Sequence, residues 1–145
     1  MSVAFRNVDA SPGDPIATWP HEALVIVIER GLVDSWRPVF AELRARPHGV
    51  VARSVAAYLD RADPDGATRL FRLVLDDARR QEDQADRAEA AARVRTCIAR
   101  SGLTAAAFAR EIGTSASRLS TYARGTVTPS AALLVRMERL AGAPG

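Results

Sequence analysis

Apolar side chains recur every three or four residues along most of this 145-residue chain. That spacing puts them on one face of an α-helix, whereas a half-buried strand would show them at every second position. Glycine, proline and N-capping residues separate the helical stretches. The pattern therefore predicts an all-α protein. Before the C-terminal third, helices are expected at about 20–30, from 34 to the break at Pro47, at 50–59 and over 67–101.

The start of the chain leaves one alternative open. The run Leu24–Ile28 is rich in β-branched residues, so it also suits a short buried strand. Pro20 at its start and Gly31 at its end favour a helix. Asp34 is the expected N-cap of the next helix, and Pro38 would then lie near its first turn, where a missing N–H is tolerated.

The segment from Ala67 to Ser101 contains no proline or glycine. It begins amphipathic, becomes charged and alanine-rich, and ends amphipathic again. It is expected to form either one long helix or two helices with a break near Gln81 to Asp86. That middle region is polar on all sides, which suits an exposed bridge between two domains.

The stretch from Thr104 to Pro129 predicts two short helices joined by a tight turn. Thr104 and Ser115 are candidate N-caps, because a hydroxyl can accept a hydrogen bond from a free backbone N–H. Gly113 and Gly125 are the expected helix ends. Two helices joined by a short glycine-containing turn form a helix-turn-helix. The alternative is a helical hairpin that only packs.

The second of these helices, about Ala116 to Arg124, should bury Leu119 and Tyr122. Its other face would then be free to enter the DNA major groove, which accepts one helix. The residues expected to read bases are Ser117, Arg118 and Thr121. The residues expected to hold phosphate are Thr104, Ser115, Arg124, Thr126 and Thr128.

One more helix is predicted near the C-terminus. Thr128 is its expected N-cap and Pro129 its first residue. Its buried stripe would contain Leu133, Leu134, Met137 and Leu140, and it would close at Gly142.

The C-terminal part resembles the Cro/C1-type (XRE-like) helix-turn-helix family of phage repressors and bacterial regulators, over about Asp86 to Ala141. The matching positions are Leu103, Phe108, Ala109, Ile112, Gly113, Ser115, Leu119, Tyr122, Gly125 and Pro129. The resemblance implies a five-helix, lambda-repressor-like domain that binds double-stranded DNA. Three positions depart from the family's usual Gln, Gln and Glu: Ala105, Ala116 and Ala123.

Charge is unevenly distributed along the chain, and every basic residue is arginine. Nine arginines and four acidic residues lie from Asp86 onward, whereas eleven arginines and thirteen acidic residues precede it. The basic excess therefore accompanies the helix-turn-helix, as phosphate binding requires.

Little in the sequence points to catalysis or to a metal. Cys97 is the single cysteine and is expected to be buried and structural, and His21 and His48 are expected to be surface polar groups. No zinc cluster, phosphate-binding glycine-rich loop or Ser/His/Asp set can be assembled from these residues. We therefore expect no enzyme activity and no cofactor. No secretory signal or membrane span is visible, so a cytoplasmic protein is the default.

The predicted organisation is a flexible arm at 1–19, an N-terminal helical bundle at 20–85 and a DNA-binding domain at 86–145. The expected function is sequence-specific DNA binding in transcription regulation, by a bacterial protein. A homodimer is expected, made by apolar segments of the N-terminal half: Leu24 to Ile28, Trp36 to Leu43 and Val50 to Leu59. One alternative is an antitoxin-like regulator whose N-terminal half binds a partner protein. Another is an interaction module that no longer binds DNA.

Overall fold

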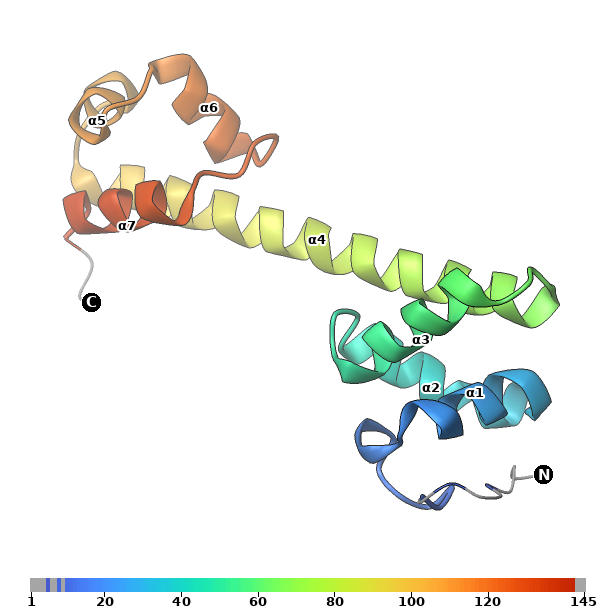
Figure 1. Ribbon diagram of the computed structural model, residues 1–145. Coiled ribbons are helices and arrows are strands. Elements are labelled where there is room, and N and C mark those ends of the chain that lie inside the picture. The colour runs from blue at the N-terminus through green and yellow to red at the C-terminus, as the bar shows by residue number, and fades with distance from the viewer. Residues whose placement is uncertain (1–4, 6–7, 9, 143–145) are drawn as a thin grey trace. The chain divides into compact units, whose positions relative to one another are not determined.

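The computed structural model describes Phe5, Val8 and residues 10–142 (Figure 1). Within these residues the chain forms seven α-helices and one short 3-10 helix, and no strand. The all-α prediction is confirmed. The chain divides into two compact units, Met1–Glu82 and Asp83–Gly145, and each has a hydrophobic core of its own.

Unit 1 is built from short helices and the first part of a long one. Its elements are η1 (Ile16–Thr18), α1 (His21–Arg30), α2 (Val33–Ala45), α3 (Val50–Arg61) and the beginning of α4 (Gly66–Ser101). The run Leu24–Ile28 lies within α1, so the helical alternative holds and the strand does not form. Leu24 and Ile28, one helical turn apart, are both buried in the core.

Three aromatic rings connect α2 to α4 within unit 1. The Phe71 ring centroid lies 4.7 Å from that of Phe40 and 5.6 Å from that of Trp36. Phe71 is fully buried, and the tilted and edge-on ring geometries are those that aromatic pairs prefer. Phe40 and Phe71 are thus core residues, and Trp36 is half-buried against the same core.

Part of the N-terminal segment also packs on this core. Phe5 meets Trp19 edge-on at 5.0 Å between centroids, and the Trp19 indole N–H donates to the Asp14 carbonyl at 3.0 Å. Val8, Ala10 and Ile16 also pack against the core. The flexible arm expected at 1–19 lies outside the described residues at 1–4, 6–7 and 9.

The start of α2 differs from the prediction. The helix begins at Val33 after Leu32, whose carbonyl accepts from the Ser35 and Trp36 amides. Asp34 is therefore not the N-cap. It lies in the first turn and pairs with Arg37 at 3.9 Å. Pro38 falls inside the helix and not in its first turn, because the helix starts before the polar residue that suggested its beginning.

Gly31 ends α1 for a reason that the sequence did not indicate. Its φ is −78°, so it does not need the left-handed conformation. A Cβ atom there would lie 2.4 Å from the Val27 carbonyl oxygen and 3.2 Å from Trp36 Nε1. The Trp36 indole N–H donates to that same carbonyl at 2.8 Å. Glycine is needed here because the indole and the end of α1 approach so closely.

Helix α4 runs without interruption from Gly66 to Ser101, which decides between the two alternatives for this segment. The residues around the suggested break are mostly good helix formers, so polarity alone does not interrupt the helix. Asp65 and Thr68 cap its start reciprocally, since each backbone N–H donates to the other's side chain at 2.8 Å. The Thr68 N–H bond lowers the pKa of Asp65. No helix in the described part of the chain is long and apolar enough to cross a membrane.

Unit 2 consists of the end of α4 followed by α5 (Ala105–Ile112), α6 (Ala116–Arg124) and α7 (Ala131–Leu140). Its described residues thus form four helices, one fewer than the expected five. The apolar stripe expected in a fifth helix belongs to α7, the fourth. The largest fully buried residues in the core of unit 2 are Val94, Phe108, Ile112, Leu119 and Met137.

The N-cap predicted for α7 is also wrong. The Ser130 hydroxyl accepts from the Leu133 amide at 3.1 Å, so Ser130 is the N-cap and the helix begins at Ala131. Thr128 is not the N-cap, and Pro129 is not in the helix. Pro129 is buried before the cap, so it packs against the unit while the following hydroxyl caps the helix. Met137 is buried, whereas Leu133, Leu134 and Leu140 of the expected stripe are half-buried.

We expect Gly31→Ala to destabilise unit 1 by about 1–3 kcal/mol, because the new methyl group would overlap the Val27 carbonyl. Thermal melting followed by circular dichroism measures this. Gly66→Ala is the matched control, since a Cβ there meets no atom within 4 Å. Its melting temperature should stay level or rise slightly. Equal melting of both variants would contradict the close approach at Gly31.

Candidate nucleic-acid interface

The turn between α5 and α6 has the cap and turn geometry that the sequence predicts. The Thr104 hydroxyl accepts from the Ala107 amide at 3.1 Å, and the Ser115 hydroxyl accepts from the Arg118 amide at 3.1 Å. Gly113 has φ +82° and ends α5 in the left-handed conformation, which glycine adopts without strain. The Thr114 amide then donates to the Ala109 carbonyl at 2.9 Å. These bonds set where α6 starts relative to α5.

Helix α6 ends at a second left-handed glycine. Gly125 has φ +79°, and a Cβ there would lie 3.3 Å from the Ala91 Cβ of α4. Conformation and close packing therefore both favour glycine at this position. Both helices of the motif thus have a hydroxyl cap at the start and a left-handed glycine at the end.

The two faces of α6 differ sharply in burial. Leu119 and Tyr122 are 1% and 8% exposed and lie in the core of unit 2. The exposed residues of the helix are Ala116, Ser117, Arg118, Ser120 and Arg124. The helix therefore presents short hydroxyls and guanidinium groups to solvent, which are groups that donate to bases and phosphates.

Thr121 is less accessible than expected. It is half-buried, and its hydroxyl donates to the Arg118 carbonyl at 2.6 Å. Its O–H is therefore engaged inside the helix, although its oxygen can still accept. Ser117 is exposed, and its hydroxyl lies 3.3 Å from that of Ser115.

Arg118 and Arg124 are both exposed but differ in their surroundings. The Arg118 side chain has no hydrogen bond or ion pair with any described residue. The Arg124 Nε–H donates to the Ser120 carbonyl at 3.3 Å, which leaves the rest of its guanidinium group accessible. Arg118 is thus free to reach a ligand beyond the helix surface.

The hydroxyls expected to hold phosphate are all exposed: Thr104, Ser115, Thr126 and Thr128. Thr104 and Ser115 accept from backbone amides as caps, and the Thr104 O–H remains available as a donor. The Ser115 hydroxyl also lies within hydrogen-bond distance of the Ser117 hydroxyl. The Thr126 hydroxyl donates to the Thr121 carbonyl at 3.1 Å. Helix N-termini such as those of α5 and α6 also favour anions, because the first N–H groups of a helix have no partner within it.

Two arginines outside the helix-turn-helix donate hydrogen bonds to it. From the sequence they could be counted only as part of the basic excess. Arg95 of α4 donates from Nη1 to the Ala123 carbonyl at 2.7 Å. Arg136 of α7 donates from Nη1 to the Ile112 carbonyl at 2.9 Å. Their partners lie 28 and 24 residues away along the chain, so no local pattern could have identified them.

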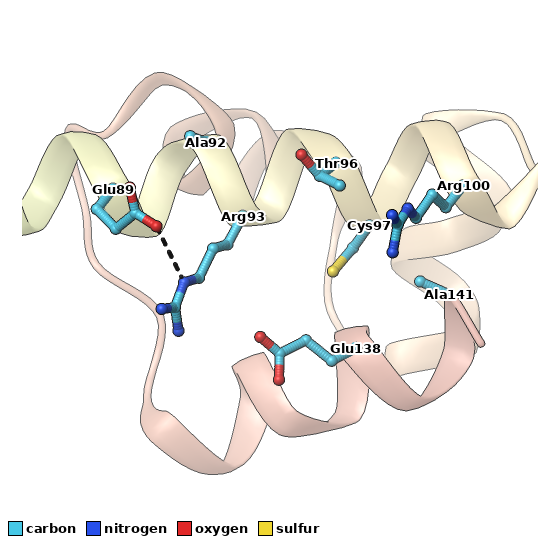
Figure 2. Close-up of a pocket in the computed structure, with 8 residues that line it drawn as sticks. All are labelled: Glu89, Ala92, Arg93, Thr96, Cys97, Arg100, Glu138 and Ala141. Atoms are coloured by element: carbon cyan, nitrogen blue, oxygen red, sulfur yellow. Dashed lines mark hydrogen bonds and ion pairs between the residues drawn. The ribbon is translucent and has the colours of Figure 1, made fainter. Parts of the chain in front are cut away.

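Cys97 lines a cavity of about 320 Å³ between α4 and α7. Figure 2 shows its thiol pointing from α4 toward α7, the helix that carries Glu138. Cys97 is 5% exposed, and burial raises its thiol pKa. The thiol is therefore protonated at neutral pH and poorly suited to be a nucleophile, in agreement with the structural role expected for it.

His21 is more engaged in unit 1 than the surface role expected for it. Its Nδ1 lies 2.7 Å from the Ser54 hydroxyl, and Arg61 Nη2 lies 3.3 Å from its Nε2. A guanidinium group can only donate, so Nε2 is the acceptor and Nδ1 carries the proton. In that tautomer the imidazole donates to the Ser54 hydroxyl.

Residues 78–145, slightly less than half of the chain, match a family model described as a helix-turn-helix domain. No curated protein and no solved structure matches the chain. The match covers α5, the turn and α6, together with the arginines that bind them from α4 and α7. The C-terminal unit therefore contains a helix-turn-helix, a motif whose second helix typically enters the DNA major groove.

Leu119→Asp should unfold unit 2, because it would bury a carboxylate without a partner at a cost of several kcal/mol. Ser120→Asp is the matched control, since it adds the same charge one position away on the exposed face. Thermal melting should show the loss for Leu119→Asp alone. Wild-type melting of Leu119→Asp would show that the buried face of α6 is assigned incorrectly.

Proposed function

We propose that this protein is a sequence-specific DNA-binding transcriptional regulator of the Cro/C1 (XRE-like) type, with α6 as its recognition helix. The observation that carries the proposal is the exposed face of α6, which presents Ser117, Arg118, Ser120 and Arg124 while Leu119 anchors the opposite face. That division is what a helix needs in order to enter the major groove without leaving its own domain.

Arg118 is the residue best placed to read sequence. It is exposed, its guanidinium group has no partner among the described residues, and arginine can bind the O6 and N7 atoms of guanine together. Ser117 and Thr121 would add base contacts, with Thr121 acting through its oxygen because its O–H is already donated. Arg124, Thr104, Ser115, Thr126 and Thr128 would hold the phosphate backbone.

We further propose that the protein acts as a homodimer formed by unit 1. One helix-turn-helix contacts few base pairs, and dimers place two recognition helices about one DNA turn, roughly 34 Å, apart. Most of the apolar runs expected to form the interface are buried in the core of unit 1 itself. Four of its exposed apolar side chains remain as candidates: Leu32, Val33, Val50 and Leu73.

Replacing the two arginines of α6 one at a time tests the readout. Arg118→Ala should cost about 1–3 kcal/mol on the preferred duplex and relax the preference at one position. Arg124→Ala should weaken binding to all duplexes alike and reduce the salt dependence of binding. Fluorescence anisotropy with matched and mismatched duplexes distinguishes the two. Unchanged affinity and preference in Arg118→Ala would contradict the assignment of the reading face.

Sedimentation of the full chain tests the dimer. The wild type should sediment as a dimer at micromolar concentration, because burial of exposed apolar surface favours association. Leu73→Asp, which puts a charge on an exposed unit 1 residue, should shift the equilibrium toward monomer. Val135→Asp, on an exposed valine of unit 2, is the matched control and should remain dimeric. A wild type that stays monomeric at high micromolar concentration would contradict the homodimer.

A further inference from the structure

In the last turn of each motif helix, one carbonyl accepts a hydrogen bond from an arginine of another helix. After Gly125 the chain turns, and the Val127 amide donates to Thr121, so it does not continue the helical pattern to Ala123. The Ala123 carbonyl instead receives Arg95 Nη1 at 2.7 Å. At the end of α5, the Ile112 carbonyl receives Arg136 Nη1 at 2.9 Å.

Both contacts have a charged donor, unlike an ordinary cap bond from a backbone amide. Hydrogen bonds from a charged donor are about twice as strong as neutral ones. A positive charge also interacts favourably with the C-terminal end of a helix, where carbonyl groups are left without partners. Each arginine therefore ties the end of one motif helix to a helix outside the motif.

The Arg95 contact belongs to a larger junction between α4 and the end of α6. A Cβ at Gly125 would lie 3.3 Å from the Ala91 Cβ and 3.6 Å from the Arg87 carbonyl oxygen. Arg87, Ala91 and Arg95 are spaced by four residues, so they lie along one face of α4. Ala91 is 3% exposed. The end of α6 is thus held on α4 by close packing and by one charged hydrogen bond.

We propose that Arg95 and Arg136 are positioning residues of the DNA interface, which fix the direction of α6 through the carbonyls of Ala123 and Ile112. This inference rests on the proposed DNA binding and adds a role for two arginines that do not contact DNA. A recognition helix reads bases only when its direction is fixed, because small misplacements break base contacts while phosphate contacts can adapt. Loss of either arginine therefore reduces specific binding more than nonspecific binding.

Salt dependence separates positioning from phosphate contact. An arginine that neutralises a phosphate lowers the slope of log affinity against log salt by about one when it is removed. A positioning arginine leaves that slope unchanged. Methionine is the test replacement, because it keeps an unbranched stem and removes both the charge and the donors.

The experiment measures binding of the full chain to a duplex selected from a random pool and to a mixed-sequence duplex, across a salt titration. Arg95→Met and Arg136→Met should each lose about tenfold on the selected duplex and about twofold or less on the mixed one, with the wild-type slope. Arg124→Met should lose affinity for both duplexes, with a slope lower by about one. Arg139→Met removes an exposed arginine of α7 that has no partner among the described residues, and it controls for net charge.

Equal loss on both duplexes with a reduced slope in Arg95→Met or Arg136→Met would overturn the proposal, and so would binding that matches Arg139→Met.

Amide hydrogen exchange of the free protein provides a readout without DNA. Arg95→Met should accelerate exchange at Gly125, Thr126 and Val127, and unchanged exchange there would overturn the Arg95 assignment. Exchange that rises throughout unit 2 would overturn it as well, because the arginine would then stabilise the whole unit. A wild type without preference for any duplex would instead refute the proposed function.

Discussion

The burial of Leu119 and Tyr122 determines which face of α6 reaches solvent, and the rest of unit 2 depends on it. Leu119 lies in one buried cluster with Val94, Phe108 and Met137, so α4, α5, α6 and α7 share one core. Because the helix cannot rotate without exposing Leu119, the side chains at 117, 118, 120 and 124 remain outside. The hydroxyl caps and the two left-handed glycines then set the length of α6 and its start relative to α5.

The positive charge of unit 2 serves two purposes. Arg118 is free among the described residues, whereas Arg95 and Arg136 donate to helix-end carbonyls. The number of arginines therefore overestimates how many guanidinium groups are free to bind phosphate. The net positive charge of the unit still attracts DNA. The arginines that neutralise helix ends also orient the surface that we propose to read bases, so folding and recognition depend on the same residue type.

The sequence predicts the motif well because its signals are local. Thr104, Ser115 and Gly113 each bond within a few residues, so cap and turn chemistry is visible in the chain. It fails at the start of α7, where Thr128 and Ser130 are both acceptable caps and only the burial of Pro129 decides between them. Arg95 could not be predicted, since its partner carbonyl is 28 residues away and any residue could supply it. The base and phosphate contacts assigned to the site remain predictions.

We propose that the exposed face of α6 gives the protein a preferred DNA sequence. Selection of bound duplexes from a random pool by the full chain, followed by sequencing, tests it most directly. We expect enrichment of a short motif containing guanine, repeated as a palindrome with half-sites about 10 base pairs apart. A pool that stays random after repeated rounds, although the folded protein is intact, would contradict it.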